Sequence, residues 1–216
     1  MNIDRYGSGP CYWELVSIIA AGAIHVTAEL LFSEAVSRVC NVVISLAFVG
    51  YVVWRVRTSP GVLRTWGMRT DNLAPAVVAH LGFAAFGALA LFGLAGTTGS
   101  VEVPTSFWVT VVLYPIYGVI QQFALQNFIA RNLRMTLSGP VAVAATAALL
   151  FGLSHFPRLD LVALAFVAGF FFTLIYQRFS NLWAVGLAHG LTAALAMYLV
   201  LGEDPGAEIL NVVRAL

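Results

Sequence analysis

The sequence predicts an all-α membrane protein, a polytopic bundle of about seven transmembrane helices that form a single transmembrane domain over residues 1–216. Hydrophobic residues make up 60% of the chain and charged residues only 10%, whereas soluble domains contain roughly 45–50% and about 25%. The apolar residues gather in runs that approach the ~20 residues needed to cross a bilayer. Lipid tolerates so much apolar surface where water does not, so we expect the chain to cross the bilayer repeatedly.

Seven apolar segments carry this prediction, and short polar turns separate them. We expect the spans at Tyr12–Phe32, Val39–Trp54, Leu73–Ala95, Phe107–Ala130, Val141–His155, Leu161–Tyr176 and Leu182–Leu201. Aromatic residues lie near the expected ends, as they do at membrane interfaces. These residues are Tyr12, Trp13, Trp54, Trp66, Trp108, Trp183 and Tyr198.

Local features refine several of these elements. The first segment stays as a span, because Met1–Pro10 lacks the basic region and the cleavage site of a secretory signal. Pro115 predicts a kink in the fourth segment. The fifth and sixth segments are short, and Pro157 with Arg158 predicts a tight turn between them. After the seventh segment, the apolar residues of Gly202–Leu216 are spaced as in a short interfacial helix.

The distribution of arginine predicts the orientation. One side of the expected topology carries Arg5, Arg55, Arg57, Arg64, Arg69, Arg131, Arg134 and Arg178. The other side carries Arg38, Arg158 and Arg214. The positive-inside rule places the first set, and the N-terminus with it, in the cytoplasm. We therefore expect an integral protein of a bacterial or archaeal plasma membrane with the lipid bilayer as a partner, and the net charge of +1 gives no indication of nucleic-acid binding.

Polar side chains inside the expected spans are the candidates for function, because they are costly in lipid. They are Glu14, His25, Glu29, His80, Gln121, Gln122, Gln126, Asn127, His155 and His189. Gln122 and Gln126 are four residues apart and share a helical face, while Gln121 lies about 100° round the helix. This polar stripe indicates either a site or hydrogen bonding between helices.

The two histidines on the fifth and seventh segments have two interpretations. A neutral imidazole is a common metal ligand and can act as an acid or a base near neutral pH. His155 and His189 could therefore converge on one metal ion or one water molecule. Alternatively, each is a core residue that bonds to a neighbouring carbonyl. We interpret His80 as such a core residue, and Glu14 as a solvated residue near the interface.

Three motifs occur in order on these spans. The stretch from Gln121 to Gln126 takes the place of Glu-Glu-x-x-x-Arg, Phe151 and His155 satisfy Phe-x-x-x-His, and His189 begins His-x-x-x-Asn with Ala193 at its end. Over about residues 105–200 the chain resembles the CPBP family of intramembrane peptidases, which includes the Rce1-type CAAX proteases and the Abi bacteriocin-immunity proteins. The resemblance implies an intramembrane endopeptidase that acts on a lipidated or membrane-embedded peptide.

The resemblance also implies roles for particular residues. It implies catalytic roles for Gln121, Gln122, Gln126, His155 and His189, with Zn²⁺ or another divalent metal bound at the histidines or with no metal at all. A carboxamide is not a base at physiological pH, however, so Gln121 and Gln122 cannot activate water as the glutamates of the family do.

Span one offers a replacement carboxylate. Glu29 shares a helical face with His25, four residues earlier. His25, Glu29, His155 and His189 would together form a metal set of three nitrogen ligands and one carboxylate. Alternatively, Glu29 reaches to the membrane interface beside Glu34.

Three functions therefore stay open from the sequence. The first is a CPBP-type endopeptidase whose base is Glu29 or a metal-bound hydroxide. The second is a catalytically inactive homologue that binds and regulates a membrane protein, as the loss of both motif glutamates suggests. The third is a membrane enzyme that uses the same histidines on a lipid substrate, because a fold does not fix a reaction.

Overall fold

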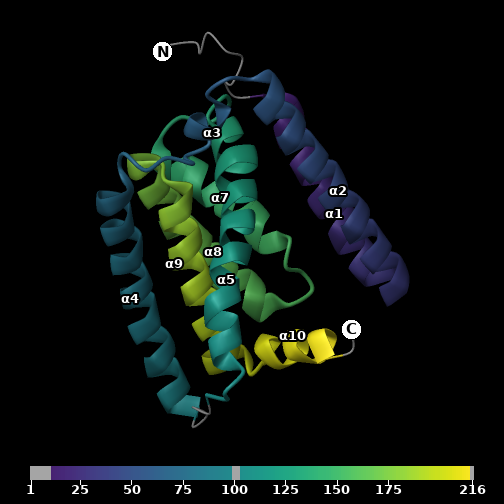
Figure 1. Cartoon of the computed structure of the whole chain (residues 1–216), viewed down its shortest axis with the longest axis vertical. Coiled ribbons are helices and arrows are strands. Elements are labelled where there is room, and N and C mark those ends of the chain that lie inside the picture. Colours follow the sequence, from purple (N-terminus) through teal and green to yellow (C-terminus); the bar gives the residue numbers. More distant parts are fainter. Residues whose placement is uncertain (1–10, 99–102, 215–216) are drawn as a thin grey trace.

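A computed structural model describes residues 11–98 and 103–214, and within these ranges the chain forms helices and no strands. This confirms the predicted all-α polytopic bundle. Six elements are long and apolar enough to cross a bilayer, and Figure 1 shows how they are arranged. They are α1 (Tyr12–Leu31), α2 (Glu34–Thr58), α4 (Leu73–Thr98), α5 (Phe107–Phe123) continued by the π-helical η1 (Ala124–Ala130), α8 (Leu159–Phe179), and α9 (Leu182–Ala196) continued by the π-helical η2 (Met197–Leu201).

The shorter elements include the segment expected as a fifth span. They are α3 (Val62–Thr65), α6 (Arg131–Leu133), α7 (Pro140–Leu153) and α10 (Pro205–Arg214). α7 has 14 residues, which at ~1.5 Å per residue is about 21 Å against a hydrocarbon core of about 30 Å. The expected span Val141–His155 is therefore shorter than a full crossing, because the helix ends before Ser154 and His155 forms part of a turn.

Helix α9 is the centre of the bundle, with α5 packed on one side and α4 on another. The contact between α5 and α9 is made by backbone. A Cβ atom at Gly118 would lie 2.8 Å from the nitrogen of Gly190, and one at Gly186 would lie 2.7 Å from the Cα of Val119. Small residues let membrane helices approach closely enough for dispersion contacts, since lipid gives little apolar driving force for association.

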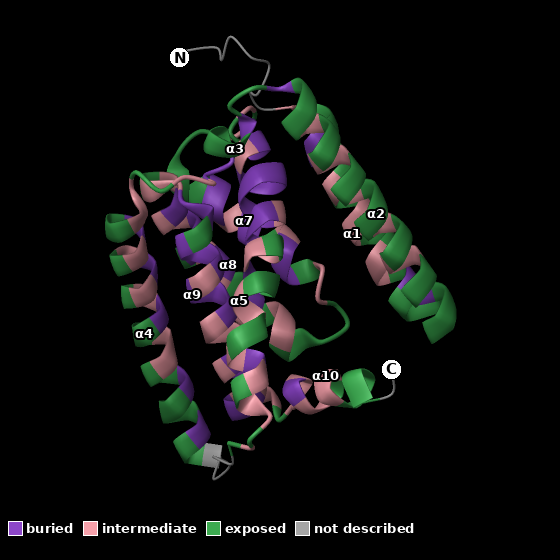
Figure 2. Cartoon of the chain, in the orientation of Figure 1, coloured by how far each residue is buried: buried purple, intermediate pink, exposed green. Residues whose placement is uncertain are grey.

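The α1–α2 hairpin is anchored to the bundle by a buried ion pair near one end. Glu14 on α1 is 4% exposed and pairs with Arg131. It also accepts hydrogen bonds from the Tyr51 hydroxyl and from Nδ2 of Asn132. The expectation of a solvated Glu14 is therefore wrong, because these partners from α2 and α6 enclose the carboxylate. Figure 2 shows the hairpin leaning away from the bundle at its other end, with largely exposed surfaces.

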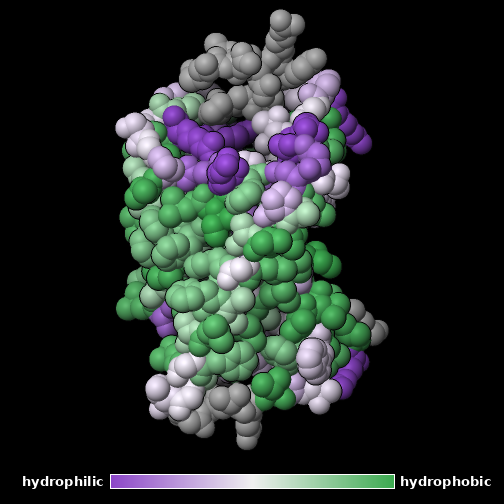
Figure 3. Space-filling model, turned by 90° about the vertical axis from the view of Figure 1, so that its left-hand side faces the viewer, coloured by the Kyte–Doolittle hydropathy of each residue, from purple (hydrophilic) through white to green (hydrophobic). Residues whose placement is uncertain are grey.

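The described arginines of the predicted larger set all lie near the ends of helices on one side of the bundle, which we call the arginine-rich end. Figure 3 shows hydrophilic side chains gathered at this end above a hydrophobic band. Arg5 and the rest of Met1–Pro10 lie outside the described residues. The cytoplasmic placement of this end stays a prediction.

The glycine contact between α5 and α9 yields a stability prediction. Gly118→Ala should lower the free energy of unfolding by about 1–3 kcal/mol, because the added methyl group meets backbone that cannot move aside. Gly93→Ala on α4 is the matched control, since a Cβ there has no neighbour within 4 Å. Thermal unfolding in detergent micelles measures both variants, and equal melting temperatures would contradict the packing described here.

Candidate functional site

A cavity of about 350 Å³ lies between α4, α5, α8 and α9. Its walls are mainly apolar, and none of the described residues that line it is charged. The polar side chains that reach it are Tyr114, Tyr117, Gln121, His155, His189 and Thr192. The cavity therefore brings together three side chains of the sequence-predicted site, from α5, from the turn after α7 and from α9.

The turn after α7 fixes the ring of His155. Its Nδ1 lies 2.9 Å from the carbonyl oxygen of Phe151. A carbonyl oxygen only accepts hydrogen bonds, so Nδ1 carries the proton and donates. The lone pair of the neutral imidazole therefore lies on Nε2. His155 is partly exposed and lines the cavity, so this basic nitrogen is available to a bound molecule.

His189 has the opposite tautomer. Its Nε2 lies 2.9 Å from Oε1 of Gln121, and an amide oxygen accepts, so Nε2 carries the proton. Its Nδ1 is buried and has no hydrogen-bond partner among the described residues. This hydrogen bond is made to the amide oxygen of Gln121. The NH₂ group of Gln121 can therefore donate to another acceptor.

Phe151 connects the two histidines. The centroid of its ring lies 5.0 Å from that of His155 and 5.9 Å from that of His189, both edge-on. Phe172 packs on another side of His189 at 5.8 Å. The two imidazoles therefore contact one aromatic ring, and their opposite tautomers place a basic nitrogen and an oriented amide in one apolar cavity.

Gln122 and Gln126 lie elsewhere. Both are fully buried and do not line the cavity. Nε2 of Gln126 donates to Oε1 of Gln122 at 2.9 Å and to the hydroxyl of Thr173 at 3.0 Å. This is the hydrogen bonding between helices that was the alternative interpretation of the stripe, and it joins α5 and η1 to α8. Only Gln121 of the three glutamines faces the site.

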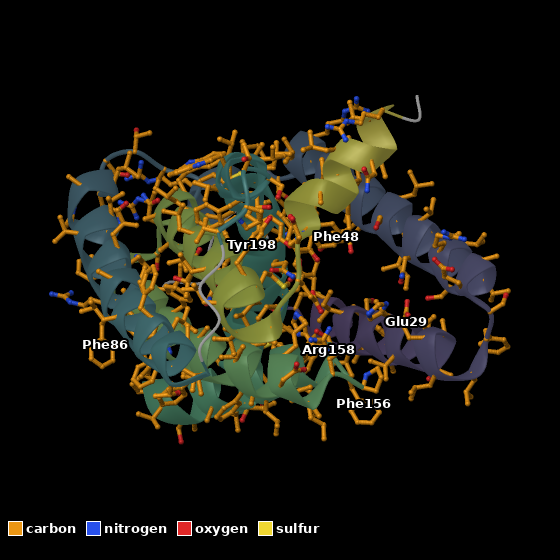
Figure 4. All side chains as sticks on the ribbon, turned by 90° about the horizontal axis from the view of Figure 1, so that it is seen from below. Glu29, Phe48, Phe86, Phe156, Arg158 and Tyr198 are labelled. Atoms are coloured by element: carbon orange, nitrogen blue, oxygen red, sulfur yellow. The ribbon has the colours of Figure 1, made fainter. Side chains whose placement is uncertain are left out.

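His25 and Glu29 do not line the cavity. Nδ1 of His25 is 2.8 Å from Oδ1 of Asn41, and Glu29 accepts a hydrogen bond from the Ser37 hydroxyl. Both partners belong to α2. Figure 4 shows Glu29 on the hairpin and Phe156 and Arg158 on the loop of the bundle. The polar side chains of His25 and Glu29 thus bond within the hairpin.

The expected set of four metal ligands is therefore not assembled. Within residues 11–98 and 103–214, no group of three or more His, Cys, Asp or Glu side chains is arranged to hold a metal ion. Catalytic zinc sites use three protein ligands, whereas the described residues that line this cavity offer two imidazoles and no carboxylate. The residues present do not fit a catalytic zinc centre.

Comparison with protein families agrees with this arrangement. Residues 103–195 match the model of the type II CAAX prenyl endopeptidase Rce1-like proteins. The matched region belongs to the CPBP family. At the level of the family, the match associates the region with CAAX-type intramembrane protease activity. Searches of the curated proteins and of the solved structures found no match.

The CPBP region runs from the loop before α5 into α9 and contains Gln121, His155 and His189. The α1–α2 hairpin and α10 lie outside it. Sequence reasoning did not single out Tyr114 or Tyr117 as lining residues. Their spacing to Gln121 places all three on one face of α5, and this signal could have identified them.

The tautomers of the two CPBP histidines can be measured. Solid-state NMR of ¹³C,¹⁵N-histidine-labelled protein in lipid should show His155 protonated at Nδ1 and His189 protonated at Nε2, because each bonds to an oxygen that only accepts. Single His→Gln variants assign the signals. Protonation of both rings at Nε2 would contradict the described hydrogen bond of His155 to Phe151.

Proposed function

We propose that the chain is an intramembrane endopeptidase of CPBP type in which His155, and not a carboxylate, is the general base. The observation that carries the proposal is the tautomer of His155. Its Nδ1–H is held by the Phe151 carbonyl, so the basic Nε2 is available in the same cavity as His189 and Gln121. A neutral imidazole can act as a general base near neutral pH.

The proposed chemistry uses one water molecule. Nε2 of His155 takes a proton from the water as its oxygen attacks the scissile carbonyl carbon. The NH₂ group of Gln121 donates to the oxyanion that develops on the carbonyl oxygen. Nε2 of His155 then returns the proton to the leaving amine nitrogen as the C–N bond breaks. His189 is a positioning residue in this scheme, because it holds the amide oxygen of Gln121.

The lining of the cavity suits a hydrophobic substrate. Its walls are apolar and uncharged, and burial of a charged group there without a partner would be costly. A lipidated or membrane-embedded peptide presents a neutral amide next to apolar groups, which this cavity can accept. Such a substrate also reaches the site from the bilayer that surrounds the helices.

Mutation of the proposed base gives a direct test. His155→Ala should lower kcat by ~100-fold or more, as loss of a general base does. Gln121→Ala should lower kcat to a similar order, about 10²-fold, as loss of an oxyanion donor does. Cleavage of a quenched fluorescent lipopeptide by protein in nanodiscs measures both.

Glu29→Gln is the matched control for these variants. It removes a carboxylate that lies on the hairpin and bonds to Ser37, so cleavage should continue at the rate of the unaltered protein. Undiminished cleavage by His155→Ala would contradict the proposal. Loss of cleavage in Glu29→Gln would restore Glu29 as the base that the sequence suggested.

Metal removal is the second test. Because the two imidazoles do not complete a catalytic zinc site, dialysis against a chelator should leave the rate of cleavage unchanged. Stoichiometric zinc in the purified protein that is lost in His189→Ala, together with loss of cleavage on chelation, would contradict a metal-free mechanism.

A second candidate is a catalytically inactive homologue that binds a membrane protein or lipid. The uncharged cavity favours it, since a binding site needs no base. The double variant His155→Ala/His189→Ala distinguishes the two functions. A binding protein would keep its cellular phenotype in this variant, whereas an enzyme would lose it at normal membrane levels.

A further inference from the structure

Helix α10 differs from the other helices in its direction. It begins at Pro205, four residues after η2 ends at Leu201. Figure 1 shows it lying crosswise to α5 and α9, at the end of the bundle opposite the arginine-rich end, and pointing toward the α1–α2 hairpin. Its ten residues are too few to cross a bilayer.

The start of α10 is firmly attached to the bundle. The carboxylate of Asp204 accepts hydrogen bonds from the hydroxyls of Ser106 and Tyr198, both at 2.6 Å, and from the backbone N–H of Ala207 at 2.9 Å. The hydrogen bond from Ser106, followed by that from Tyr198, lowers the pKa of Asp204. Gly206 packs so closely that a Cβ there would lie 2.9 Å from the hydroxyl oxygen of Thr110.

Helix α10 is amphipathic, and its attachment at Gly206 defines which face packs on the bundle. At 3.6 residues per turn, Ile209, Leu210 and Val213 lie on the same side as the buried Gly206. The opposite side carries Glu208, Asn211 and Val212, and Arg214 lies at the boundary between the two sides. The apolar face is thus the face directed toward the bundle, and the polar face is directed away from it.

The apolar face extends beyond the protein that covers its start. Val213, in the last turn of this face, is 62% exposed. Helix α5 is long and apolar enough to cross a bilayer, and α10 packs against its first residues, so α10 lies at the level where this membrane helix begins. The outer surface of α5 near this level exposes large hydrophobic side chains, among them Trp108 and Val112.

We propose that α10 binds the lipid surface at this end of the bundle, with its apolar face among the outermost acyl-chain segments and its polar face in water. A short amphipathic helix binds an interface in this way. A bilayer around the membrane helices would reach the position of Val213. One exposed valine on this face offers far less area than the ~800 Å² per partner of a stable protein interface.

The experiment compares two positions on opposite faces of α10. A nitroxide label is placed at Val213→Cys or at Asn211→Cys, in a background of Cys11→Ser and Cys40→Ser, which removes both native cysteines. Both labelled positions lie beyond the Asp204 attachment. The proteins are reconstituted into vesicles of phosphatidylglycerol and phosphatidylethanolamine, and power saturation measures collisions with oxygen and with a water-soluble nickel chelate.

The label at position 213 should collide mainly with oxygen, and the label at 211 mainly with the nickel chelate. The ratio of the two collision rates should thus be clearly higher at 213. Equal nickel accessibility at both positions would overturn the proposal, because α10 would then stand in water. An immobilised label at 213 with spin–spin broadening would also overturn it, because a second copy of the chain would then cover the face.

Discussion

The close approach of α5 to α9 is the constraint on which the site depends. Gly118, Gly186 and Gly190 let the two backbones touch. Gln121 lies one turn after Gly118, and His189 immediately precedes Gly190. The glycine contact therefore places an amide and an imidazole at hydrogen-bond distance. Any residue with a larger side chain at the contact would move the helices apart and separate the pair.

The polar side chains of the site are neutral groups that form hydrogen bonds, and none of them is charged. No described residue lining the cavity is charged, and neutral imidazoles and an amide avoid the cost of an unpaired charge in lipid. The motif position that carries a first glutamate in the CPBP family is Gln121 here, which points to the site. Gln122 and Gln126 have structural contacts instead, because their amides bond to each other and to α8. In the matched region, the polar groups that reach the cavity are therefore neutral ones.

The sequence predicted what depends on local composition and spacing. Long apolar runs predicted the membrane helices, and motif order singled out His155 and His189, which line one cavity. The sequence could not predict contacts that depend on how the helices tilt relative to one another. Glu14 is buried because Arg131 and Asn132, more than a hundred residues later, reach it. Glu29 does not line the cavity, and it bonds to Ser37 within the hairpin. These outcomes depend on tertiary geometry, which no periodicity in one segment encodes.

The meeting of both histidines at the ring of Phe151 is the central claim, and a distance measurement tests it most directly. 4-Fluorophenylalanine at position 151 introduces a single fluorine into ¹⁵N-histidine-labelled protein in lipid, and fluorine–nitrogen recoupling reports which imidazoles are near. The ring contacts of 5.0 and 5.9 Å predict dephasing of the nitrogen signals of both His155 and His189. Dephasing of only one of the two would contradict the shared site.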